Sequence, residues 1–246
     1  MNSKRVYRQD SQGLRLSSFS VKIKETDLWI AVESGAYSEE LPVLVEHFIW
    51  KLRRQLEDYL AENSHLVSSL EPSLLNNDAP EIARLMILQS NKAGVGFMAS
   101  VAGAFAESAG CFLLDYSREV VVENGGDIFI KVDQPVTVGI YAGNSSLSGK
   151  LALRVLPEKT PLGVCTSSGT VGPSLSMGKA DAVVVLSPSV PLADAVATAM
   201  GNMINSDHDF DKALEFARNL ERITGALLIY RDKIAAWGDL ELQKVE

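Results

Sequence analysis

Asp194 and Thr198 are the residue pair in this sequence best suited to chemistry. They lie four positions apart in an alanine-rich segment, 192–200, that contains no glycine or proline, and this composition favours a helix. A spacing of four places the carboxylate and the hydroxyl on one helix face, one turn apart. Two such oxygen donors suit Mg²⁺, which takes few protein ligands and keeps positions for phosphate and water. The alternative is a buried packing helix in which Asp194 caps the helix start.

A glycine pair in the segment Asn124-Gly-Gly-Asp127 separates two runs with the pattern of β-strands. Asn-Gly predicts a tight hairpin turn. Paired glycines also let a backbone approach a ligand closely, so Gly125 and Gly126 are candidates for contact with phosphate. Asp127 would then reach a metal ion or a ribose hydroxyl, and it is a candidate general base.

A second polar segment, Thr166–Asp181, holds six hydroxyls, three glycines, one lysine and one carboxylate within sixteen residues. Amides and hydroxyls in such a loop can form an anion-binding nest. The alternative is a solvated loop, held at the end of a sheet by the apolar runs around Cys165 and Val183. Asp181 is a second candidate general base, of equal weight to Asp127. The candidates for phosphate contact are Ser167, Ser168, Gly169, Thr170 and Lys179.

Other motifs point less clearly to a reaction. Gly94–Ala99 matches the dinucleotide fingerprint G-x-G-x-x-A, which needs a strand before it, whereas the apolar spacing from Ile82 to Leu88 predicts a helix. An NAD-binding enzyme therefore stays a third possibility. Ser176-x-x-Lys179 matches an acyl-transfer motif whose partner motifs are missing. All three histidines lie outside these loops, which disfavours hydrolysis by a Ser-His pair.

Composition limits the partners of the chain. A net charge of −8 over 246 residues argues against a nucleic-acid partner. Cys111 and Cys165 offer neither a disulfide framework nor metal-ligand spacing. The basic start of the sequence lacks the apolar region of a signal peptide, and Val95–Leu114 contains Glu107 and three glycines, as expected of a buried helix. We expect a cytoplasmic protein with no nucleic-acid and no membrane partner; a homodimer stays open.

The apolar pattern predicts one α/β (α+β) domain over residues 1–246, with mixed, mostly antiparallel sheets packed against several helices and a short disordered N-terminus over 1–12. Asp78 is the expected N-cap of the second helix. The predicted helices cover 39–60, 78–92, 97–109, a segment around 192–200, and 209–220. The predicted strands are two within 14–32, followed by 119–122, 128–132, 136–141, 151–156, 164–167, 182–186, 227–230 and 234–237.

Three segments together give the sequence a family resemblance. In this order, a glycine-pair strand, a Ser-Gly segment and an Ala-Asp-x-x-x-Thr helix resemble the ApbE superfamily of FAD:protein FMN transferases. The closest likeness is to a bacterial and archaeal ApbE-like family placed beside those transferases, and it covers residues 18–238. The segments that carry it are Glu25–Leu28, Val122–Ile128, Thr166–Gly172, Gly178–Ala182 and Ala193–Ala199.

The resemblance implies a function. The flavin transferases take FMN from FAD and place it on a threonine or serine of a target protein, with Mg²⁺ assisting. It implies Mg²⁺ and FAD or FMN as cofactors, Asp194 and Thr198 as metal ligands, and a backbone carbonyl within 96–103 as a further ligand. The leading hypothesis is a Mg²⁺-dependent flavin- or nucleotide-binding protein, a phosphotransferase of FMN-transferase type. The sequence has no histidine after its Ser-Gly segment, so a non-catalytic ligand-binding or interaction module with this fold is the alternative.

Overall fold

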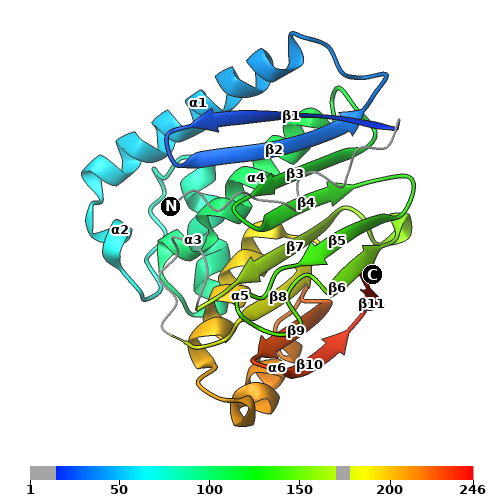
Figure 1. Cartoon of the computed structure of the whole chain (residues 1–246). Helices are drawn as coiled ribbons and strands as arrows, with labels where there is room; N and C mark the ends of the chain where they lie inside the picture. Colours follow the sequence, from blue (N-terminus) through cyan, green and yellow to red (C-terminus); the bar gives the residue numbers. More distant parts are fainter. Residues whose placement is uncertain (1–14, 170–177, 246) are drawn as a thin grey trace.

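The computed structural model describes residues 15–169 and 178–245, and it shows helices, a large sheet and a small sheet stacked as layers (Figure 1). All neighbouring strands in both sheets are antiparallel, so the predicted fold class is confirmed. The large sheet has the order β1 (Leu16–Ile23), β2 (Thr26–Glu33), β3 (Val120–Asn124), β4 (Asp127–Lys131), β7 (Leu162–Ser167), β8 (Ala182–Ser187), β9 (Gly225–Tyr230) and β10 (Lys233–Gly238). The small sheet has the order β11 (Glu241–Lys244), β6 (Leu151–Val155) and β5 (Val136–Ile140).

Helices cover one face of the large sheet, and the small sheet covers the other (Figure 1). Strand β8 shows why a central strand is apolar throughout: Val183 packs in the core on the helix side, and Val184 packs in the core beneath the small sheet. The helices are α1 (Leu41–Glu62), α2 (His65–Ser68), α3 (Glu81–Ala93), α4 (Val101–Leu113), α5 (Val190–Met203) and α6 (Phe210–Arg218), with the 3-10 turns η2 (Phe97–Ser100), η3 (Pro157–Lys159) and η4 (Asp207–Asp209).

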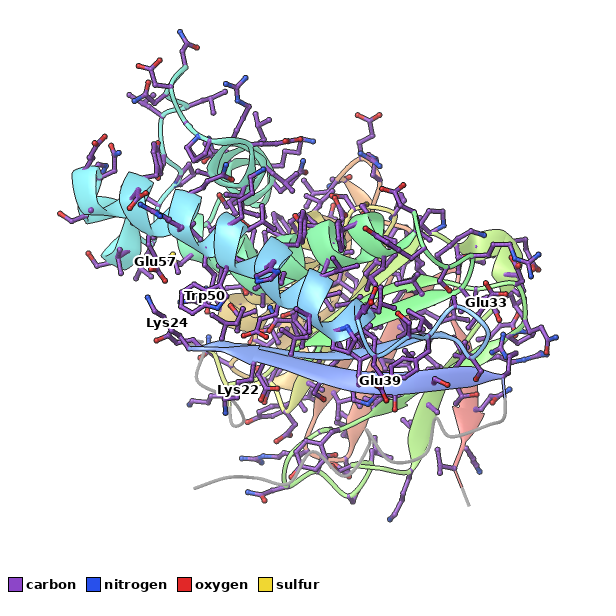
Figure 2. The ribbon with its side chains drawn as sticks, turned by 90° about the horizontal axis from the view of Figure 1, so that it is seen from above. Lys22, Lys24, Glu33, Glu39, Trp50 and Glu57 are labelled. Atoms are coloured by element: carbon purple, nitrogen blue, oxygen red, sulfur yellow. The ribbon has the colours of Figure 1, made fainter. Side chains whose placement is uncertain are left out.

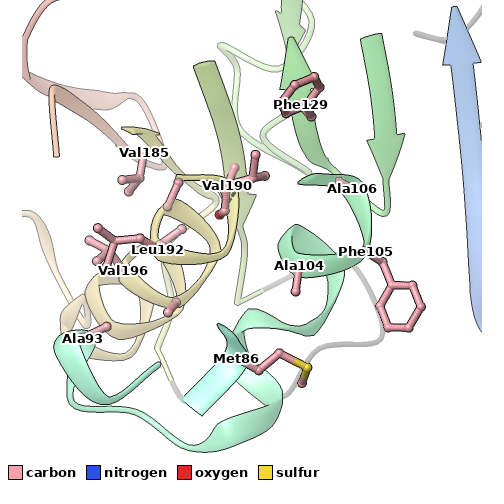
Figure 3. Packing of buried hydrophobic residues seen from close by; sticks show 14 of the residues in the cluster. Met86, Ala93, Ala104, Phe105, Ala106, Phe129, Val185, Val190, Leu192 and Val196 are labelled. Carbon is pink, nitrogen blue, oxygen red and sulfur yellow. Dashed lines mark hydrogen bonds between the residues drawn. The ribbon is translucent and has the colours of Figure 1, made fainter. Parts of the chain in front are cut away.

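Helices α4 and α5 approach each other closely because small residues line their contact. A Cβ added to Gly103 of α4 would lie 2.7 Å from the carbonyl oxygen of Val190 and 2.9 Å from the Cβ of Asp194. Figure 3 shows the surrounding buried side chains, with Ala104 on α4 and Leu192 on α5. This close crossing brings Asp194 to the first turn of α4.

Helix α1 covers the hairpin of β1 and β2 (Figure 2). Lys24, in the turn of the hairpin, forms an ion pair with Glu57 at 2.7 Å and lies over the ring of Trp50 at 5.9 Å. The inner side of this helix carries Val45, Ile49 and Leu56, which are buried. Val43 is half-exposed on its outer side.

The structure corrects several sequence predictions. Helix α3 begins at Glu81 with Pro80 at its N-cap and no side-chain cap, so the prediction of Asp78 as N-cap is wrong. The segment before Gly94 is this helix and not a strand, which removes the dinucleotide fingerprint. Helix α2 lies outside the predicted helices, and β11 was not predicted. The disorder prediction for residues 1–12 lies outside the described residues.

Among the described residues, no single helix has the length and apolar composition to cross a membrane. Helix α3 and the stretch from η2 through α4 pass that test only as a pair bent by 103°.

Candidate functional site

Four segments far apart in the sequence meet at one end of the large sheet. Asp127 at the start of β4 pairs with Cys165 near the end of β7. The Gly169 N–H donates to the Ala180 carbonyl oxygen at 2.9 Å, which extends the pairing of β7 with β8. The Asn124 Nδ2 donates to the Ala102 carbonyl oxygen at 3.1 Å and ties the glycine turn to the start of α4. The glycine turn therefore borders the start of α4, and the end of β7 lies beside this turn, since an added Cβ on Gly126 would be 3.7 Å from the Thr166 carbonyl oxygen.

Asp194 and Thr198 lie on a partly accessible face of a mostly buried helix. Both residues are partly buried, whereas residues 190–193 and 195–197 of α5 are buried. The Asp194 Oδ2 accepts a hydrogen bond from the Gly103 N–H at 2.9 Å. Since the first turn of a helix has free amides and a positive dipole end, this carboxylate caps α4. It does not cap its own helix, whose N-cap is Ser189.

Glu107 of α4 makes the reciprocal contact, which the sequence did not reveal. Its Oε2 accepts a hydrogen bond from the Val190 N–H, the first residue of α5, at 2.7 Å. Burial raises the pKa of Glu107 above its usual value, and this hydrogen bond opposes the rise. Glu107 is the one charged residue in the segment 95–114, and that isolation is the signal that could have identified it. The two helices thus cap each other and fix the position of Asp194.

Asp127 is the carboxylate of this end of the sheet best suited to proton transfer. It is 7% exposed and belongs to the face of β4 that packs against the helices. Burial raises the pKa of Asp127 to about 7, and the charge of Glu123 adds to the rise, whereas the neighbouring Cys165 side chain and the Thr166 backbone oppose it. A carboxyl group with a pKa near neutrality can accept or donate a proton at physiological pH.

Asp127, Cys165 and Asp194 influence one another electrostatically. Burial raises the pKa of Asp194 well above its usual range, and the charge of Asp127 raises it further, whereas the Gly103 amide opposes the rise. Burial also raises the pKa of the Cys165 thiol, with Asp127 and Asp194 adding to it. Within the described part of the chain, no lysine or arginine is among the groups that shift the pKa of either carboxylate. A cation at this place would relieve their mutual repulsion.

The glycine pair forms the predicted hairpin turn. Gly125 and Gly126 have φ angles of 70° and 109°, the left-handed values that a two-residue turn between paired strands requires. The Gly126 N–H donates to the Glu123 Oε1 at 2.8 Å, so this amide already has a partner. Close approach of a ligand to this turn therefore concerns Gly125, which is exposed.

The described residues of the second polar segment lie in two separate places. Ser167 is the last residue of β7, beside the glycine turn, and Ser168 and Gly169 follow it; all three are partly buried or exposed. The exposed Lys179 lies at the far end of α5, where its N–H donates to the Ile204 carbonyl oxygen at 2.7 Å. Thr170 lies outside the described residues.

Asp181, the second candidate base, has a structural partner. Its Oδ2 accepts a hydrogen bond from the Arg231 N–H at 2.5 Å, in the turn between β9 and β10. Arg231 has a φ angle of 57°, a conformation that costs energy for a residue with a side chain. The Asp181 carboxylate helps to hold this turn.

The donor set fits Mg²⁺ better than a metal held by side chains alone. In residues 15–169 and 178–245, no group of three His, Cys, Asp or Glu side chains could hold a metal ion. Asp194 and Thr198 offer two oxygen ligands, and the Ala102 carbonyl lies beside Gly103 at the same helix start. Mg²⁺ accepts such a partial set, because water and phosphate oxygens complete its octahedron.

Solved structures show which class of fold this is. A flavinyl transferase ApbE of Pseudomonas stutzeri aligns with a TM-score of 0.56 at 16% identity, over 91% of this chain and 94% of that chain. The flavin transferase ApbE of Vibrio cholerae aligns with a TM-score of 0.55 at 13% identity, over 91% and 97%. The fold is therefore that of the ApbE flavin transferases.

Sequence comparison identifies the family. The model of a family described as AbpE bacteria matches residues 8–235, and the chain belongs to this family. A UPF0280 protein of Methanocella arvoryzae is 44% identical, over 89% of this chain and 87% of that protein. A UPF0280 protein of Methanocaldococcus jannaschii is 40% identical, over 91% and 92%.

Proposed function

We propose that the chain is a Mg²⁺-dependent, flavin-binding phosphotransferase that cleaves the pyrophosphate of FAD. One observation carries this proposal: the Asp194–Thr198 face, partly accessible on a buried helix, lies at the end of the sheet where Asp127 has a pKa of about 7. Metal ligands and a group able to take a proton are the two parts that phosphoryl transfer needs. The fold shared with ApbE flavin transferases supports FAD as the substrate.

Asp194 and Thr198 would hold the metal. When bound there, Mg²⁺ supplies positive charge that stabilises the phosphate oxygens as the phosphoanhydride breaks. The Gly103 and Ala102 amides orient the Asp194 carboxylate, and we expect this carboxylate and the Thr198 hydroxyl one turn further along α5 to face the ligand.

The transfer itself balances without a further reactant. A hydroxyl of the acceptor attacks the phosphorus of the FMN half, and Asp127 takes the hydroxyl proton on its carboxylate. The phosphoanhydride bond breaks with its electron pair on AMP, and the FMN phosphate becomes esterified to the acceptor. With water as acceptor, the products are FMN and AMP. We assign the base to Asp127, because the Asp181 carboxylate is bonded to the Arg231 N–H.

The loops would position the phosphates. Gly125, Ser167, Ser168 and Gly169 lie at the end of the sheet that adjoins the start of α4, where the Gly103 amide binds Asp194, so their amides and hydroxyls can contact the pyrophosphate oxygens. Lys179 lies beside the C-terminal end of α5, where its charge can balance that of a phosphate or lie beside the nucleoside. Thr170 and Gly126 complete the set of residues predicted to contact phosphate, although the Gly126 N–H already donates a hydrogen bond to Glu123.

Incubation with FAD tests the proposal. Purified protein is mixed with FAD in Mg²⁺ or in EDTA, and FMN and AMP are separated by chromatography. We expect both products in Mg²⁺ and neither in EDTA. FAD that is neither bound nor cleaved under any of these conditions contradicts the proposal.

A non-catalytic ligand-binding module is the second candidate. It is favoured by the capping bond from Gly103 to Asp194, because that bond gives the carboxylate a structural role that needs no metal. Tight binding of FAD with no AMP formed, in Mg²⁺ as in EDTA, is the result that supports the module.

A further inference from the structure

A surface segment between α1 and α3 exposes large apolar side chains. Leu74 is 95% exposed, and Leu70 is 59% exposed, values that are unusual for leucine in a well-packed domain. Leu66, in the same segment, is buried and anchors it to the core. We call the exposed group the leucine surface, and it consists of Val67, Leu70, Leu74 and Leu75.

Backbone contacts hold the leucine surface in a defined shape. The Ser73 N–H donates to the Asn91 Oδ1 at 2.9 Å, and the Asn91 Nδ2 donates to the Ser73 carbonyl oxygen at 2.7 Å. Gly96 packs so closely against Ser69 that an added Cβ would lie 1.8 Å from the Ser69 carbonyl oxygen. A loop fixed in this way presents its leucines without a large entropic cost on binding.

The leucine surface has an excess of negative charge, although the guanidinium of Arg84 in α3 donates a hydrogen bond to the Asn77 carbonyl oxygen at 3.0 Å beside it. Between residues 61 and 83 the chain has four carboxylates and no lysine or arginine. Anionic membranes and nucleic acids would be repelled by such a surface. A polypeptide with apolar side chains flanked by lysine or arginine matches it in both respects. The carboxylates are Glu62, Glu71, Asp78 and Glu81, and all are exposed.

The leucine surface also adjoins the candidate site. Helix α2 packs against η2, and η2 leads directly into the first turn of α4. That turn carries Gly103, whose amide binds Asp194. A polypeptide docked on the leucine surface therefore lies near the turn whose amide binds Asp194.

We propose that the leucine surface docks the acceptor polypeptide through a segment in which apolar side chains alternate with or are flanked by lysine or arginine. The identity of this occupant as the acceptor rests on the proposed function. Apolar contacts with Leu74 and Leu75 supply affinity, and the surrounding carboxylates select basic partners.

Peptide selection tests the docking surface. A random library of short displayed peptides is selected in EDTA, without FAD, on the full chain. We expect enrichment of peptides that combine Leu, Ile, Val or Phe with Lys or Arg. The affinity of an enriched synthetic peptide, measured by fluorescence anisotropy, should fall about tenfold or more in the Leu74→Ser/Leu75→Ser variant and in Glu71→Lys. The matched control, Val43→Ser/Leu44→Ser on the outer side of α1, should bind within about twofold, since its apolar side chains are exposed elsewhere.

Several results would overturn the proposal. These are an absence of enriched apolar-basic peptides, equal binding by the Leu74→Ser/Leu75→Ser variant, and stronger binding to vesicles of anionic lipid than to the peptide. A dimer in sedimentation equilibrium that dissociates in this variant would assign the surface to a second copy of the chain instead.

The docking proposal and the proposed function can fail separately. The Leu74→Ser/Leu75→Ser variant should form AMP from FAD and water at the wild-type rate, because it leaves the candidate site intact. Asp194→Asn should bind the peptide like wild type. Thermal unfolding by circular dichroism confirms that each variant is folded before binding is compared.

Discussion

Asp194 accepts a hydrogen bond from the Gly103 N–H at 2.9 Å and thereby joins α5 to the first turn of α4. The bond engages Oδ2 of the carboxylate. This bond gives Asp194 a structural role that is separate from the metal-binding role we propose for it. Substitutions that keep one of these properties and remove the other separate the two roles.

Asp194→Asn should preserve stability and abolish metal-dependent activity. The asparagine oxygen can still accept the Gly103 hydrogen bond, whereas the negative charge that attracts Mg²⁺ is lost. Asp194→Ala removes both and should lower the free energy of unfolding by about 1 kcal/mol, the typical cost of losing a helix cap. Urea unfolding in EDTA measures both variants. Equal losses of stability in the two variants would show that the capping bond contributes nothing.

Gly103→Ala should destabilise the protein, because its Cβ would lie 2.7 Å from the Val190 carbonyl oxygen. Overpacking of this kind typically costs about 1–3 kcal/mol. Gly35→Ala is the control, since an added Cβ there meets nothing within 4 Å. We expect its free energy of unfolding to stay within about 0.5 kcal/mol of wild type. If Gly103→Ala matches the control in urea unfolding, α4 and α5 do not cross as closely as described.

Stability of the metal-free protein should fall as the pH rises. Asp127 has a folded-state pKa of about 7 against a usual value of 3.8, so the folded state binds more protons between these values than the unfolded state does. The contribution of Asp127 to the free energy of unfolding is fully present below about pH 4 and is lost as the pH approaches 7. The loss is at most about 4 kcal/mol. Urea unfolding in EDTA at about pH 5 and about pH 8 measures the loss.

Asp127→Asn provides the comparison for this pH dependence. Its decline in stability between the two pH values should be clearly smaller than that of wild type, because position 127 no longer titrates. A wild-type protein that becomes more stable over the same interval would contradict the raised pKa of Asp127.

Thr198→Val tests the second of the two proposed metal ligands. The change removes the hydroxyl and keeps the side-chain shape. We therefore expect the Mg²⁺ concentration that gives half-maximal FAD cleavage to rise about tenfold. Thr198→Ser keeps the hydroxyl and should stay within about threefold of wild type. An unchanged Mg²⁺ dependence in Thr198→Val would remove Thr198 from the site.

Local signals in the sequence predicted the parts of the fold that depend on neighbouring residues. The Asn124-Gly-Gly-Asp127 turn follows from the need for left-handed backbone at both central positions, which glycine meets. The continuous apolar run of β8 follows from burial on both faces. The prediction for Asp78 was wrong although its sequence pattern is that of a helix cap. Its N–H donates a hydrogen bond to the Asn76 side chain, and the helix begins after Pro80.

The candidate site could be predicted only in part. A spacing of four placed Asp194 and Thr198 on one helix face, but the partner of Asp194 is 91 residues away and that of Glu107 is 83 residues away. Such contacts depend on how α4 and α5 cross, which no local pattern encodes. Strand β11 was missed because all four of its residues are exposed and lack the alternation of a half-buried strand.

Formation of AMP from FAD, compared in Mg²⁺ and in EDTA for wild type and Asp194→Asn, tests the metal-dependent chemistry most directly. We predict AMP from the wild-type protein in Mg²⁺ alone, and none above background from the folded Asp194→Asn variant. AMP released at the same rate in EDTA, or by the variant at the wild-type rate, would contradict a metal site at Asp194.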